Sequence, residues 1–146
     1  HIDSARAVID AAALRWASEP PSSAALIEQA LALVLDQHER HSSMHLLITE
    51  QAARDEEIMT GAVGLQSAFV AAVGEALRGL LPGEPEQELE IRARLLVFVI
   101  GAAVHELLLP ARAHEHGDQA LLRAHVGRML HAYLNDASAD ARARRR

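Results

Sequence analysis

Three histidines within eight residues, His38, His41 and His45, are the side chains whose spacing most suggests chemistry. On one unbroken helix they would stand at i, i+3 and i+7 and share a face, where neutral imidazoles can hold a zinc ion. Ser42 and Ser43, however, more naturally end one helix and cap the next. The segment is therefore predicted to be a polar helix boundary without a metal. A metal-binding helical bundle that uses these three histidines, with or without enzymatic activity, is the alternative interpretation.

A second group of polar side chains stands within apolar helical sequence. His105 directly follows the apolar run 95–104, and Gln66 lies one helical turn before Phe69. Small-molecule pockets are mostly apolar and carry a few placed polar groups, so these residues are pocket candidates. Ordinary core packing is the more frequent alternative for each of them. The candidate ligand-binding residues are Trp16, Met44, Leu47, Met59, Val63, Gln66, Phe69, Phe98 and His105.

Catalysis and general nucleic-acid binding receive little support. The chain has no cysteine, no glycine-rich phosphate loop and no nucleophile elbow, so we predict no enzyme, no catalytic residue and no cofactor. A net charge of −6 disfavours general binding to nucleic acid. The basic cluster at 142–146 is typical of a solvated tail.

The composition predicts an all-α protein, an antiparallel bundle of about six helices. Half of the 146 residues are apolar and only 3% are aromatic, a balance that favours helix over sheet. Proline-containing breaks at 20–21, 81–85 and 110 divide the chain. The predicted helices span residues 4–18, 24–40, 44–54, 55–81, 86–109 and 118–135.

The last two helices are predicted to pair with those of a second copy. The run 95–104 is apolar on every side, and such a helix needs partners all round. The last helix carries an apolar stripe beside small residues. Two such helices from each of two copies would form a four-helix bundle at the dimer interface. The candidate interface residues are Leu96, Ile100, Leu107, Leu122, Val126, Met129, Leu130 and Tyr133.

Three segments carry a resemblance to a known family. They read MHLLITEQAARDEEI (44–58), VAAVGEALRG (70–79) and RLLVFVIGAAV (94–104). In this order, after a capped helix and before an amphipathic one, they resemble the C-terminal regulatory domain of TetR-family transcriptional repressors. The resemblance covers about residues 22–135.

The resemblance implies a ligand-binding and dimerisation domain over residues 1–135, with 4–18 as connector helix. The basic tail 136–146 has no apolar period and is expected to be disordered. It implies a homodimer and a small apolar or amphipathic effector, whose binding shifts the DNA affinity of the intact protein. The helix-turn-helix reader of the family has no counterpart in this sequence, so DNA contact is expected only through such an N-terminal domain.

No leader sequence is visible, and the apolar run 95–104 is about half of the ~20 residues that a membrane helix needs. The expectation is therefore a cytoplasmic protein without membrane contact. A helical interaction module that has no pocket is a third interpretation.

Overall fold

The computed structural model describes residues 2–40, 55–108 and 118–143, with side chains through residue 106 in the second segment and 136 in the third. These residues form α1 (Ile2–Ser18), α2 (Ser23–Arg40), α4 (Glu56–Leu80), α5 (Glu86–Ala103), the π-helical turn η1 (Val104–Leu108) and α7 (Gln119–Ala143). The described part of the chain contains no strand, so the all-α prediction is confirmed. The predicted helix 44–54 lies outside the described residues.

The helices begin where the sequence offers capping side chains. The Ser22 hydroxyl accepts a hydrogen bond from the Ala25 amide at 3.2 Å. Asp55 accepts from the amides of Glu57 and Ile58, and Asp118 caps α7 in the same way. Each oxygen satisfies amides that have no partner within the first helical turn. The predicted starts are therefore correct to within one or two residues.

The last two helices differ from the prediction in their C-terminal parts. The predicted α-helix 86–109 changes into a π-helical turn at Val104, and such turns are uncommon and often found at functional sites. The backbone of α7 stays helical to Ala143, whereas the sequence pattern predicts a helix end near Asn135 and disorder from residue 136. Alanine and arginine, both good helix formers, recur in this stretch and explain the longer helix.

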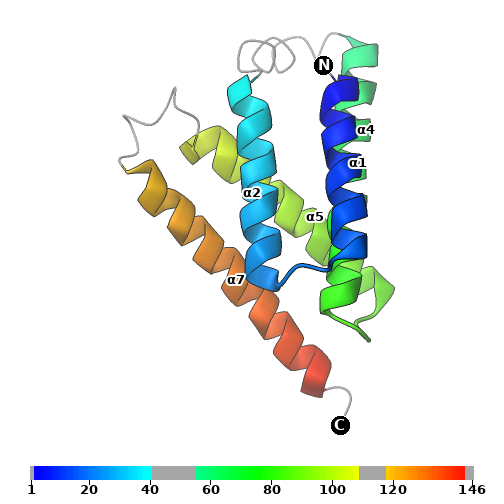
Figure 1. The fold of residues 1–146 in the computed structure, drawn as a ribbon, viewed down its shortest axis with the longest axis vertical. Coiled ribbons are helices and arrows are strands. Elements are labelled where there is room, and N and C mark those ends of the chain that lie inside the picture. Colours follow the sequence, from blue (N-terminus) through cyan, green and yellow to red (C-terminus); the bar gives the residue numbers. More distant parts are fainter. Residues whose placement is uncertain (1, 41–54, 109–117, 144–146) are drawn as a thin grey trace.

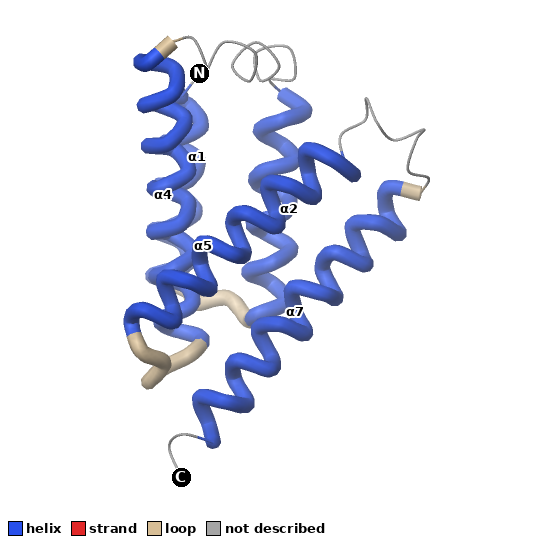
Figure 2. The backbone as a smooth tube through the Cα atoms, turned by 180° about the vertical axis from the view of Figure 1, so that it is seen from behind, coloured by secondary structure: helices blue, strands red, loops and turns tan. Residues whose placement is uncertain are grey.

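The helices are not all antiparallel to their neighbours. In Figure 1, α1 and α4 lie side by side and run in the same direction, because α2 returns the chain to the end where α1 began. Figure 2 shows α5 crossing obliquely in front of α2, between α4 and α7. Helix α7 packs on α2 and η1. The antiparallel arrangement predicted from the sequence therefore holds for α2 and α7 but not for α1 and α4.

A buried tryptophan links the C-terminal end of α1 to α2. The indole of Trp16 is 2% exposed, and its N–H donates to the Gln29 side-chain oxygen at 2.7 Å. Leu26, Leu77 and Leu81 belong to the same buried cluster. A large aromatic ring whose one polar group is satisfied gives this end both apolar contact area and a fixed orientation.

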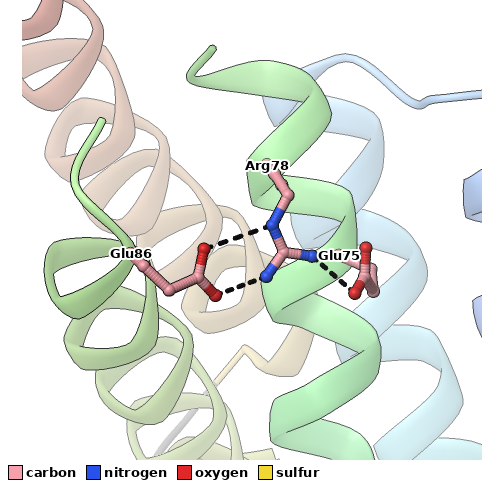
Figure 3. A network of polar contacts seen from close by, with 3 residues as sticks. All are labelled: Glu75, Arg78 and Glu86. Carbon is pink, nitrogen blue, oxygen red and sulfur yellow. Dashed lines mark hydrogen bonds and ion pairs between the residues drawn. The ribbon is translucent and has the colours of Figure 1, made fainter. Parts of the chain in front are cut away.

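The turn between α4 and α5 is held by arginines on both helices. Gly83 takes a φ of 92°, which a residue without Cβ adopts at little cost. Glu84 is buried and accepts from Arg92 at 3.1 Å, and the Arg92 guanidinium lies 5.5 Å from the centre of the Tyr133 ring on α7. On the outer side, Figure 3 shows Arg78 of α4 between the carboxylates of Glu75 and Glu86.

Among the described helices, α4 alone has the length and hydropathy that crossing a membrane requires, with a mean hydropathy of 1.3 over its most apolar window. This criterion rests on length and composition alone. In this fold α4 packs lengthwise on α1 and against α5.

We predict that Arg92→Leu lowers the free energy of unfolding by about 3 to 5 kcal/mol, because it removes one partner of a buried ion pair. The matched control is Arg94→Leu, which removes an exposed i,i+4 pair with Glu90 and should change stability by less than about 1 kcal/mol. Urea unfolding followed by circular dichroism measures both. Equal effects of the two substitutions would contradict a structural role for the buried pair.

Candidate functional site

An apolar cavity of about 450 Å³ lies between α1, α2, α4 and the α5–η1 segment. Its volume is within the range of small-molecule sites. Small residues on three helices leave the space open: Ala5, Ala62, Gly101 and Ala102 all line it. A Cβ added to Gly101 would meet no atom within 4 Å. The remaining lining residues are Ile2, Ile9, Leu33, Val34, Gln37, His38, Leu65, Gln66, Phe69, Val97, Phe98 and His105.

Four of the lining residues are polar, and two of them form a pair. These are Gln37, His38, Gln66 and His105, and among the described lining residues none carries a carboxylate or a guanidinium. His38 of α2 and His105 of η1 meet with their Nε2 atoms 3.0 Å apart. Their rings stand at 89° to each other, with centroids 4.6 Å apart. The wall thus combines a large apolar surface with one concentrated hydrogen-bonding group.

The tautomers of the pair follow from the hydrogen bond at the other nitrogen of His38. The Nδ1 of His38 lies 2.7 Å from the carbonyl oxygen of Val34, which can only accept. His38 therefore carries its proton on Nδ1, and in the neutral pair its Nε2 accepts from the Nε2–H of His105. The two imidazoles consequently act as one hydrogen-bonded unit.

Burial lowers the pKa of His38 below its ordinary value, and the nearby His105 lowers it further. The hydrogen bond from Nδ1 to the Val34 carbonyl opposes this shift but is the smaller effect than burial. A charged imidazole is poorly solvated beside apolar side chains. The uncharged form of His38 is thus favoured in the folded chain.

Of the nine residues predicted to bind a ligand, four line this cavity: Gln66, Phe69, Phe98 and His105. Trp16 lies in the packed core, while Met59 and Val63 are exposed and do not line the cavity. Met44 and Leu47 lie outside the described residues. Sequence reasoning missed the contribution of α1 and of Leu33 to Gln37. The α1 residues have a detectable pattern, since Ile2, Ala5 and Ile9 follow helical spacing.

The predicted dimer residues lie largely inside the single chain. Leu96, Ile100, Val126 and Leu130 belong to the buried core, and Leu122 and Tyr133 pack against it. Met129 alone among the described candidates is strongly exposed, and the Leu107 side chain lies outside the described residues. The reason is that α7 packs onto α2 of its own chain, with Arg123 on Glu28 at 3.1 Å. Amphipathic spacing reveals that a face is buried but not by which molecule.

The alternative metal site cannot be traced through all three of its histidines, since His41 and His45 lie outside the described residues. Within 2–40, 55–108 and 118–143 no three His, Asp or Glu side chains are grouped so as to hold a metal ion.

Comparison of the chain with protein-family models, with curated proteins and with solved structures finds no match.

We predict that stability falls as the pH drops below about 6.5, the ordinary histidine value, and continues to fall toward the lower pKa of folded His38. In that interval the unfolded chain binds more protons than the folded chain, so acid favours unfolding. His38→Gln should reduce this loss of stability, measured by urea unfolding between pH 7.5 and 5.5. The exposed His125→Gln is the control. An identical pH profile for His38→Gln and the wild type would contradict the assignment.

Proposed function

We propose that this chain is the effector-sensing and dimerisation domain of a TetR-like transcriptional repressor. The observation that supports the proposal most is the cavity, which has the volume, apolar lining and sparse polar groups of a small-molecule site. The helical order and the resemblance of three segments to that family agree with it. The proposed ligand is a small apolar or amphipathic effector.

Helix α1 is the element through which a bound ligand would act on the rest of the proposed repressor. Ile2, Ala5 and Ile9 form part of the cavity wall, so a ligand would touch the helix that the resemblance makes the connector to a DNA-binding domain. A ligand shifts a conformational equilibrium only as far as it binds one state better than the other. An effector packed against α1 would favour one position of that helix. In the intact protein this would change the spacing of two DNA-reading domains and lower operator affinity.

The proposed dimer uses a different face from the one named by the sequence pattern. Helix α5 exposes Ile91, Leu95, Phe98 and Ala102 at i, i+4, i+7 and i+11, which form one apolar stripe. Contiguous exposed apolar surface of this kind commonly marks a protein–protein contact. A second copy of the chain is the partner that the family resemblance suggests.

We expect Gly101→Leu to weaken binding of the neutral apolar dye N-phenyl-1-naphthylamine at least tenfold, because the new side chain occupies the cavity. Gly64→Leu is the matched control: it is also a helical glycine with open space around its Cβ position, but it does not line the cavity. Fluorescence titration gives both affinities. If the dye binds wild type and Gly101→Leu equally well, the cavity is not its site and the proposal loses its main support.

Two substitutions separate association from folding. Leu95→Glu should convert a dimer to a monomer while the helical content and melting temperature stay near those of the wild type, because Leu95 is exposed. Val126→Glu should instead unfold the chain, since it places a charge in the core. Sedimentation velocity and circular dichroism report the two effects. A wild-type chain that is monomeric at 50 µM, or a Leu95→Glu variant that still dimerises, would contradict the proposed face.

A further inference from the structure

The cavity opens toward the outer side of α4 and α5. Its residues Ala5 and Ile9 on α1 are buried, whereas Gln66 on α4 and Phe98 and Ala102 on α5 line it and are also exposed to solvent. Phe98 is 66% exposed. Figure 2 shows α4 and α5 in front of α1 and α2, on one side of the molecule. A ligand held by one chain would therefore keep part of its apolar surface in water at this opening.

The opening coincides with one end of the exposed apolar stripe of α5. Phe98 and Ala102 belong both to the cavity wall and to the stripe, which continues through Leu95 to Ile91. Leu95 and Ile91 do not line the cavity. Whatever packs on the stripe therefore also comes close to the ligand, and the two residues farther along α5 can be changed without altering the cavity wall.

A groove between α4 and α5 lies beside the stripe. Gln66 and Phe98 line this groove as well as the cavity. Small side chains form much of the groove lining, namely Ser67, Ala71, Gly74 and Ala93. One face thus carries large exposed apolar side chains next to a groove lined by small ones. Such a face can pack against a copy of itself, as an isologous contact requires.

The charges beside the stripe also suit a contact between two copies. Glu90 and Arg94 are exposed, lie 2.6 Å apart, and directly precede Ile91 and Leu95. Two α5 helices can cross antiparallel about a two-fold axis, with Ile91 against Leu95 of the partner subunit. Symmetry then brings Glu90 beside Arg94 of the partner subunit, and Arg94 beside the partner subunit's Glu90. Opposite charges therefore meet on both sides of the axis, which favours this partner and this orientation.

We infer that a second copy of the chain completes the ligand site, by packing antiparallel on α5 and covering the opening beside Phe98 and Ala102. The same crossing places the first turns of the partner's α5 over that opening. A ligand would then leave more of its apolar surface buried in the dimer than in one chain. Because linkage is reciprocal, the ligand strengthens the dimer by the factor by which the dimer strengthens ligand binding. This inference rests on the proposed function, since it specifies how the partner contributes to the same cavity.

Exchanging charges one copy at a time tests the contact. Glu90→Arg and Arg94→Glu should each weaken self-association at least tenfold, because like charges then meet across the axis. An equimolar mixture of the two variants should associate about as tightly as the wild type, since each arginine of one copy meets a glutamate of the other. Sedimentation velocity measures association, and circular dichroism checks that each variant folds. A mixture that associates no better than either variant alone would rule out this crossing of α5.

Dye binding tests whether the partner completes the site. Leu95→Glu should bind N-phenyl-1-naphthylamine at least tenfold more weakly than the wild type, although Leu95 does not line the cavity. Leu121→Glu is the matched control, because Leu121 on α7 is 54% exposed against 46% for Leu95 and lies outside the cavity wall. This control should keep wild-type association and dye affinity. In the wild type, saturating dye should strengthen the dimer by the same factor of at least ten.

The results that would overturn the inference differ in what else they affect. Equal dye affinity for the wild type and a monomeric Leu95→Glu would show that one chain holds the complete site, and would leave the sensing cavity of the proposed function intact. A wild-type chain that stays monomeric with the dye bound would remove the dimer but not the cavity. Failure of the dye to bind either protein would remove the proposed function as well.

Discussion

The buried ring of Trp16, bonded to α2 while its own helix packs along α4, is the constraint that ties these three helices together. The ring is almost fully buried, and its N–H is fixed by Gln29, so the C-terminal end of α1 is held to the start of α2. Toward the other end of α1 the facing residues Ala5 of α1, Ala62 of α4 and Gly101 of α5 are too small to fill the space between the helices. They leave a pocket of about 450 Å³ that is partly open to solvent, and a bound molecule would cover its apolar lining.

The position of the cavity connects the proposed ligand to two other parts of the molecule. Helix α1 forms one wall, and Phe98 belongs both to the wall and to the exposed stripe of α5. A ligand that reorients Phe98 would alter the surface proposed for dimer contact, while one that packs on Ile9 would bias α1. Sensing and association are then coupled through shared side chains rather than through a long chain of contacts. The C-terminal end of α1, held to α2 by the Trp16–Gln29 hydrogen bond, would stay in place while the N-terminal part of the helix moves.

Sequence patterns predicted where the helices lie, but not which side chains of the same chain contact one another. Prolines and capping residues such as Asp55 are local, so the boundaries followed from neighbours in the chain. The π-helical turn at Val104 did not, because nothing in the apolar run 95–104 distinguishes it from an α-helical turn. His105 was identified as a pocket candidate from the apolar run before it, and no local signal identifies its partner on α2. His38 was singled out for its spacing to His41 and His45, yet its described partner lies 67 residues away on η1.

Val126 and Leu130 illustrate the same limit. Their helical spacing predicts that they are buried, but only the fold shows that residues of their own chain bury them.

Amide hydrogen–deuterium exchange of the chain with and without saturating N-phenyl-1-naphthylamine tests the central claim most directly, since it reports backbone opening helix by helix. If the cavity binds a small molecule against the connector helix, exchange should slow in α1 around Ala5 and Ile9 and in the facing part of α4, while α7 stays unchanged. Binding that leaves exchange in α1 unaltered, or that protects α7 instead, would contradict a sensing site built on α1.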